Sequence, residues 1–134
     1  MKTELIKYTK KIARKEGFDN VNVKFCNLYF SGKKAVLGEC SRKKKIIKFC
    51  MIFTLPYKII EKIYSKPDMW ETMLHEVCHL KEEKPFEVYI FSDLKKNEYI
   101  DWQHNLAFWK ELRSMKKRYS GLKNKFMIEL QNEN

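Results

Sequence analysis

The chain has 134 residues, which is the length of one domain, and we expect residues 1–134 to form a single unit. Hydrophobic residues make up 44% and aromatic residues 14%, so the composition excludes a chain that is disordered over most of its length. The formal net charge of +11 at pH 7 favours polyanionic partners such as nucleic acid, although a lysine-rich surface also serves solubility.

Four cysteines occur, at positions 26, 40, 50 and 78, and no two of them form a Cys-x-x-Cys pair. That spacing argues against a zinc ribbon or a redox motif. The segment 1–18 is charged throughout and lacks the apolar region of a signal peptide, and no apolar run approaches the length of a membrane span. We therefore expect reduced thiols, a cytoplasmic location, no membrane partner and a monomer, although the sequence leaves the oligomeric state open.

The first half of the chain predicts one helix and three strands. Apolar residues at helical spacing indicate a helix over 3–15, which Gly17 would end. The sequences VNVKFCNLYF, AVLGEC and KIIKFCMIF then read as three strands, separated by turns at 31–33 and 41–44. Because the connections are short, we expect an antiparallel meander.

The second half predicts helices. A short helix follows Thr54, and Asp68 with Glu71 resembles a capping box at the start of the next helix, which must end before Pro85. The sequence FEVYIF is a candidate further strand. A longer helix is expected from about Tyr99 to Tyr119, and LKNKFMIELQ is either a short helix or a docked tail.

The segment 75–79 carries an H-E-x-x-H sequence on one of these predicted helices. Residues four apart lie on one helix face, so His75 and His79 can both reach one zinc ion at about 2.0–2.1 Å. Glu76 can then take a proton from a zinc-bound water and pass it to the leaving amine. The alternative without a function is a pair of neighbouring histidines that bind no metal. Against it, the rest of the predicted helix offers apolar residues for burial, namely Met73, Leu74, Val77, Cys78 and Leu80.

A catalytic zinc site needs a third protein ligand besides a water molecule. His104 is the one remaining histidine, and Phe108 falls four residues later on the same stripe of the predicted helix. Packing of that helix on the first would bring His104 to the metal. A carboxylate also completes such sites, so Glu83, Glu87 and Glu98 are the alternatives.

At these residues the chain resembles the SprT-like metallopeptidases, the group that includes the Spartan proteases. The resemblance consists of His75, Glu76 and His79, then His104 with Phe108-Trp109, and it extends over about 21–118. It implies a zincin-like α+β fold. In that fold a small three- to four-stranded, largely antiparallel sheet packs against the H-E-x-x-H helix and a following third-ligand helix. It also implies a zinc cofactor and a protease acting on DNA-associated proteins. The minigluzincins, with a glutamate as third ligand, are the rival family.

The expected function is therefore a zinc-dependent metalloendopeptidase that hydrolyses peptide bonds of a protein or peptide substrate. The alternative is a basic nucleic-acid-binding module with a structural or vestigial zinc site. The candidate nucleic-acid contacts form two basic clusters, although a solvated turn or helix end is the more common explanation of such a cluster. Tyr29 and Phe30 could stack on bases, whereas the spacing of Phe108 and Trp109 indicates core. The two clusters are Lys43, Lys44 and Lys45, and Lys116, Lys117 and Arg118.

Overall fold

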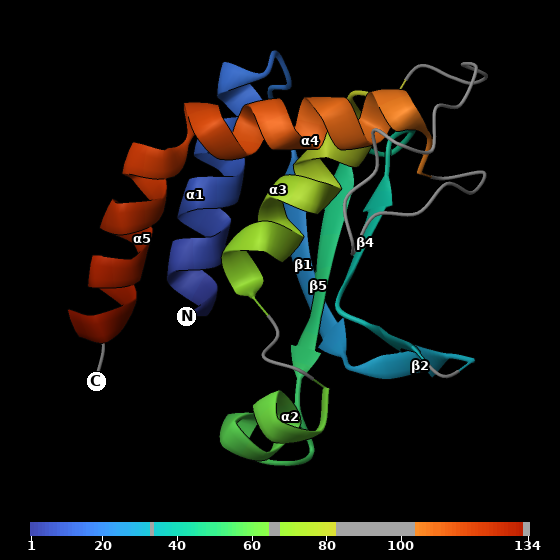
Figure 1. The fold of residues 1–134 in the computed structure, drawn as a ribbon, viewed down its shortest axis with the longest axis vertical. Helices are drawn as coiled ribbons and strands as arrows, with labels where there is room; N and C mark the ends of the chain where they lie inside the picture. Colours follow the sequence, from blue (N-terminus) through green and yellow to red (C-terminus); the bar gives the residue numbers. More distant parts are fainter. Residues whose placement is uncertain (33, 65–67, 83–103, 133–134) are drawn as a thin grey trace.

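The computed structural model describes residues 1–32, 34–64, 68–82 and 104–132. Within these residues, five helices and five strands form an α+β fold (Figure 1). None of the helices in these ranges is long and apolar enough to cross a bilayer. In chain order the elements are α1 (Lys2–Lys15), β1 (Asn22–Asn27), β2 (Tyr29–Ser31), β3 (Lys34–Val36), β4 (Gly38–Ser41), β5 (Ile46–Ile52), α2 (Tyr57–Tyr64), α3 (Met69–Leu80), α4 (Leu106–Arg118) and α5 (Ser120–Asn132).

The main sheet is mixed, so the expected antiparallel meander is wrong. Its strand order is β1-β5-β4, with β1 parallel and β4 antiparallel to the central β5, while β2 and β3 form a separate antiparallel pair. Parallel neighbours need a connection of a dozen or more residues, and residues 28–45 supply it. The parallel register sets Val23 beside Ile47 and Phe25 beside Phe49, which gathers apolar side chains on one face.

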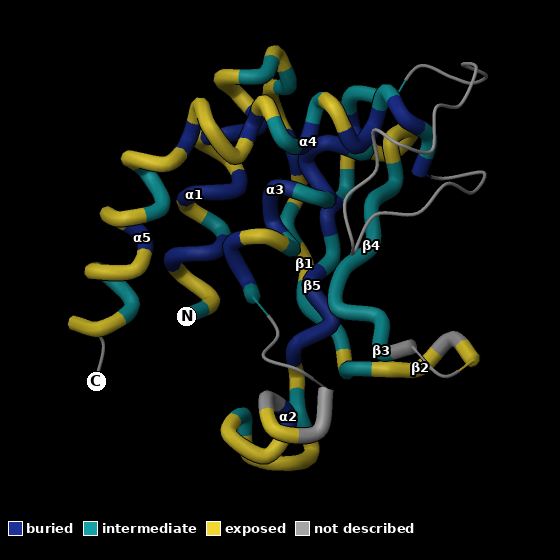
Figure 2. The backbone as a smooth tube through the Cα atoms, viewed as in Figure 1, coloured by how far each residue is buried: buried dark blue, intermediate teal, exposed yellow. Residues whose placement is uncertain are grey.

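Helices α1 and α3 cover that apolar face, and the other face of the sheet carries no helix in the described residues (Figures 1 and 2). Ile47 and Phe49 of β5 are fully buried in one core cluster with residues of α1, α3, α4 and α5. At the far end of this cluster the ring of Tyr8 meets Phe126 edge-on, with centroids 5.4 Å apart. Of the two possibilities for the last segment, a short helix or a docked tail, the structure shows a helix, α5, whose Phe126 side chain is buried in the core.

Two side-chain caps define where the functional helices begin. The Asp68 carboxylate accepts hydrogen bonds from the backbone N–H groups of Trp70 and Glu71, which confirms the predicted start of α3. The Asn105 side chain accepts from Phe108 N at 2.8 Å and starts α4. His104 therefore precedes the helix instead of lying within it. The predicted strand over 86–91 and the expected helical residues before 104 lie outside the described residues.

An ion-pair network ties α1, α3 and α4 together. The Lys81 ammonium lies 2.6 Å from Glu16 Oε1 and 2.5 Å from Glu111 Oε1, and Arg118 reaches both carboxylates at 2.9 Å. Tyr119 donates a further hydrogen bond to Glu16. Burial alone would raise the pKa of Glu16, but the hydrogen bonds from Lys81 and Tyr119 outweigh it and hold that pKa below its usual value. The same network lowers the pKa of Glu111.

This network predicts a loss of stability in acid. A carboxyl whose pKa is depressed on folding stabilises the protein fully above its unfolded pKa of about 4.3 and loses that contribution as pH falls from there through its folded pKa. The free energy of unfolding, measured by urea denaturation, should therefore fall between about pH 5 and pH 3. Glu16→Gln should cost about 1–3 kcal/mol at pH 7 and flatten this dependence. Asp19→Asn, in an exposed pair 3.7 Å from Arg14, should keep the wild-type slope.

Candidate metal centre

Three histidines from two separate parts of the chain converge beside α3. His75 and His79 lie one turn apart on α3, and His104 lies just before α4. One ring nitrogen from each comes within 4.8 Å of the other two, and the Nε2 atoms of His75 and His104 are 3.0 Å apart. The structure thus brings together the three histidines that the sequence predicts as ligands. The alternatives Glu83, Glu87 and Glu98 lie outside the described residues.

The three nitrogens fit a single cation. Nitrogen atoms 2.0–2.1 Å from a tetrahedral zinc ion lie about 3.3 Å from one another. Separations of 3.0 Å and up to 4.8 Å bracket this value, so side-chain rotations can bring the three rings onto one ion. Imidazole also suits copper, iron and nickel. The geometry therefore identifies a site that can hold a metal ion without naming the element.

The first turn of α4 supports the histidine rings. The ring of Phe108 stacks on His79 with centroids 4.5 Å apart, and the ring of Trp109 stacks on His104 at 5.5 Å. Both aromatic residues are buried, as their spacing predicts. Because Asn105 caps the helix between His104 and these rings, the start of α4 fixes the third ligand and its packing together. Sequence spacing identified these residues as core but not as neighbours of the ligands.

The Glu82 carboxylate lies against His79, one of the candidate ligands. Glu82 Oε1 lies 3.1 Å from His79 Nδ1, and a carboxylate can only accept in this contact. A carboxylate beside this nitrogen favours the tautomer that has its proton on Nδ1 and its lone pair on Nε2, where a cation can bind. Outer carboxylates of this kind commonly fix the tautomer of a metal ligand. The sequence analysis missed Glu82, although a glutamate three residues after a ligand histidine is a readable signal.

Glu76 is buried beside the histidines and packs against β4. Its side chain is only 5% exposed, and burial raises its pKa to about 7, with Glu39 and Glu82 adding to the shift and His79 opposing it. A cation on the histidines would lower this pKa, because a nearby positive charge favours the carboxylate. The group is therefore a carboxyl in a desolvated position next to the ligand set.

Gly38 of β4 makes room for Glu76. A Cβ atom at position 38 would lie 2.9 Å from Glu76 Cγ, closer than real Cβ contacts allow, and a tight 3.0 Å from Thr72 Cγ2. The strand backbone thus approaches α3 closely only because residue 38 has no side chain. Cys40 lies on the same strand, and burial, with the charge of Glu76, raises the pKa of its thiol to about 12. No sequence spacing could reveal the Gly38 contact, since Glu76 lies 38 positions further along the chain.

The two predicted basic clusters differ in the structure. Lys43, Lys44 and Lys45 are exposed in the turn between β4 and β5. In the other cluster, Lys116 pairs with Glu71 at 3.2 Å and Arg118 belongs to the ion-pair network, which leaves Lys117 exposed in the last turn of α4. The positive charge of Lys116 and Arg118 is therefore already balanced within the fold.

Comparison with protein-family models, with curated proteins and with solved structures gave no match to this chain. Inference about its function therefore rests on the residues and their geometry.

The geometry predicts how substitutions change metal affinity. Wild-type protein should bind one equivalent of Zn²⁺ in competition with a chromophoric chelator. Glu82→Gln should weaken binding by about 10–100-fold, because His79 loses the carboxylate that fixes its tautomer. His104→Ala should weaken it further. Glu71→Gln, on the exposed first turn of α3, is the control and should leave the affinity unchanged. Equal affinity in wild-type protein and His104→Ala would contradict the three-histidine site.

Proposed function

We propose that this chain is a zinc-dependent metalloendopeptidase in which Glu76 moves the protons. The observation that carries the proposal is a set of three convergent histidines with a buried carboxyl at Glu76, directly after His75 in α3 and within electrostatic reach of His79. Three protein ligands leave a fourth position of a tetrahedral ion for water or substrate, which is the arrangement of catalytic zinc sites, whereas structural sites are closed by four protein ligands.

The three imidazoles would hold the ion, and a bound zinc would polarise the substrate carbonyl and make water nucleophilic at neutral pH. The remaining steps belong to the protein. As the water oxygen bonds to the carbonyl carbon, Glu76 takes one proton from that water. When the carbon–nitrogen bond breaks, Glu76 returns the proton to the leaving nitrogen and is again a carboxylate.

The burial of Glu76 supports this role. A carboxylate shielded from bulk water keeps its proton within the site between the two steps. The close backbone of β4 at Gly38 restricts where the Glu76 side chain can lie, which favours one orientation. Peptide bonds as the substrate class, and proteins bound to DNA among the targets, are drawn from the resemblance to SprT-like metallopeptidases.

The alternative, a nucleic-acid-binding module with a structural or vestigial zinc site, accounts for fewer of these features. A structural site gains nothing from the buried carboxylate, and burial of an ionisable group costs stability. The burial of Glu76 despite this cost therefore favours the hydrolase over a structural or vestigial zinc site.

Glu76→Gln provides the direct test. The amide is close in size and binds no proton at neutral pH, so cleavage of casein should fall by about 10²–10⁴-fold while zinc binding is retained. Zinc content is measured on the same preparations by mass spectrometry. Glu71→Gln is the matched control and should cleave as the wild type does. Undiminished cleavage by Glu76→Gln would remove Glu76 from the mechanism.

Gly38→Ala tests the positioning of Glu76. The new Cβ must displace the Glu76 side chain or β4, so kcat should fall by about 10–100-fold while zinc affinity changes little. Gly121→Ala is the control, because a Cβ at that position in α5 meets no atom within 4 Å. Wild-type kcat in a folded Gly38→Ala protein would show that this contact does not matter for catalysis.

A further inference from the structure

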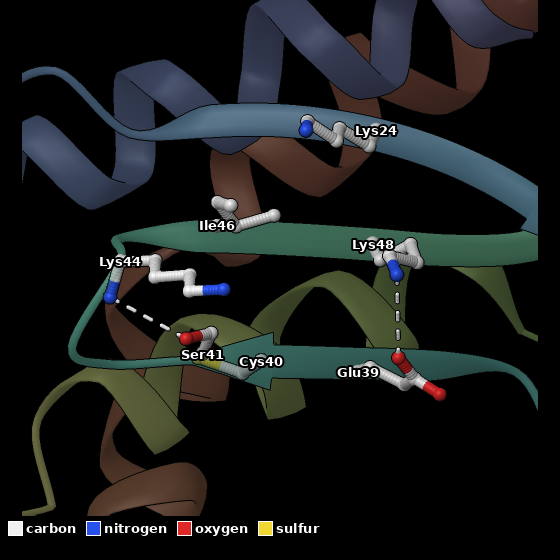
Figure 3. Close-up of a pocket in the computed structure, with 7 residues that line it drawn as sticks. All are labelled: Lys24, Glu39, Cys40, Ser41, Lys44, Ile46 and Lys48. Atoms are coloured by element: carbon white, nitrogen blue, oxygen red, sulfur yellow. Dashed lines mark hydrogen bonds and ion pairs between the residues drawn. The ribbon is translucent and has the colours of Figure 1, made fainter.

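Two cysteines, Cys26 of β1 and Cys50 of β5, lie side by side in the main sheet. They are direct partners in the parallel register, and their sulfur atoms are 2.9 Å apart, with the Cys26 thiol donating to the Cys50 sulfur. Both are free thiols. Side chains alternate along a strand, so the pair shares a face with the preceding partners Lys24 and Lys48 (Figure 3). This is the open face of the sheet, the one that α1 and α3 leave uncovered.

The sequence spacing did not reveal this pair. Cys50 lies 24 positions after Cys26, so the two do not form a Cys-x-x-Cys motif. The parallel pairing of β1 with β5 brings them together, and that pairing could not be read from the turns between the strands.

The spacing of the two strands suits a disulfide bond. Neighbouring strands lie about 4.7–4.9 Å apart, and the Cα atoms of a disulfide are usually about 4.4–6.8 Å apart. The two sulfurs have to approach from 2.9 Å to about 2.05 Å, the length of the bond. Rotation of two side chains that already point toward each other can supply this change.

Apolar packing on the other face of the sheet holds the two cysteines in register. Phe25 and Phe49, the partners directly before them, stack with ring centroids 5.9 Å apart. Phe49 is fully buried, so β5 cannot slip by one residue without moving its apolar side chains to the open face. The two sulfurs are therefore held together by the fold and do not depend on a chance encounter.

The two thiols differ in access and in acidity. Cys26 is partly exposed, whereas Cys50 is fully buried. Burial raises the pKa of the Cys50 thiol well above its usual value, and Cys26 and Glu39 add to the shift. Cys50 therefore stays protonated, and an oxidant in solution reaches Cys26 first.

We propose that Cys26 and Cys50 form a redox-active dithiol, which a hydroperoxide converts to a disulfide between β1 and β5. The peroxide transfers one oxygen atom to the Cys26 sulfur, which gives a sulfenic acid and leaves an alcohol or water. The Cys50 sulfur then bonds to the Cys26 sulfur, and the hydroxyl group leaves with the Cys50 proton as water. The two thiols lose two electrons, which reduce the peroxide. A dithiol reductant reverses the reaction by thiol–disulfide exchange.

The disulfide stabilises the part of the sheet that borders Glu76. It closes a loop over residues 26–50, which contains β2, β3 and β4 and therefore Gly38. Such a link restricts the unfolded chain more than the folded one. The bond forms whether or not the chain is a peptidase, so this inference is independent of the proposed function.

Peptide mapping tests the pairing, because trypsin leaves each cysteine on a peptide of its own. Folded protein is treated with hydrogen peroxide, alkylated and digested. Wild-type protein should yield residues 25–33 joined to residues 49–58, two hydrogen atoms lighter than the separate peptides. The number of free thiols should fall from four to two and return to four with dithiothreitol.

Three variants assign the roles. Cys50→Ala leaves Cys26 without a partner, so dimedone should label Cys26 as a sulfenic acid. Cys26→Ala should lose thiols at least about tenfold more slowly than the wild type, because only buried or half-buried thiols remain. Cys40→Ala is the control and should form the same linked peptide, since Cys40 lies on the strand face toward α3.

Oxidation of the wild type should raise Tm by about 5–10 °C, and reduction should restore the original value. An oxidised protein that melts no higher than the reduced one would overturn the stabilising effect. Linkage of Cys26 to any other cysteine, a disulfide between two chains, or a link that forms only in urea would overturn the proposal itself.

Discussion

The close contact of α3 with β4 on one side and with the start of α4 on another is the constraint on which the site depends. Gly38 allows the strand backbone to reach the Glu76 side chain, and the Phe108 ring lies against His79. His104 belongs to neither α3 nor the sheet, so its position is only as exact as the packing of α4 on α3. The cap at Asn105 and the ion pairs of Lys81 hold that packing at both ends of the interface.

A buried Glu76 is a local conflict that the rest of the fold has to support. The carboxyl is desolvated, and the nearby carboxylates of Glu39 and Glu82 oppose its ionisation further. An ordinary core position would hold an apolar residue here, as its neighbours Met73 and Val77 do. Positions where the local preference is violated in this way are typical of functional sites, because the unfavourable interaction is retained for what it does.

Short-range signals in the sequence predicted the start of α3 and the three histidines that converge, but not where α4 begins. The Asp68 cap, the i, i+4 spacing of His75 and His79, and the apolar stripe through Phe108 are all short-range signals, and the structure agrees with them. The strand pairing could not be predicted in this way. Short turns favour the pairing of strands that are neighbours in the sequence, whereas the structure pairs β1 with β5 in parallel, with Val23 beside Ile47 and Phe25 beside Phe49. Contacts across the fold, such as Gly38 with Glu76, leave no periodic trace in the chain.

Strand β4 contributes to both faces of the sheet, and its alternation separates two kinds of chemistry. Gly38 and Cys40 are in register with Phe49 and Ile47 and lie on the side of α3, whereas Glu39 and Ser41 are in register with Lys48 and Ile46 on the open face. Gly38 thus lies against the buried carboxyl, whereas Glu39 and Ser41 lie on the open face of the sheet (Figure 3). The strand keeps the side chains of the two faces apart, but their charges still interact, because Glu39 raises the pKa of Glu76 from the opposite face. Since Lys48 lies close to Glu39, the basic residues of the open face partly balance a charge that would otherwise act on Glu76 more strongly.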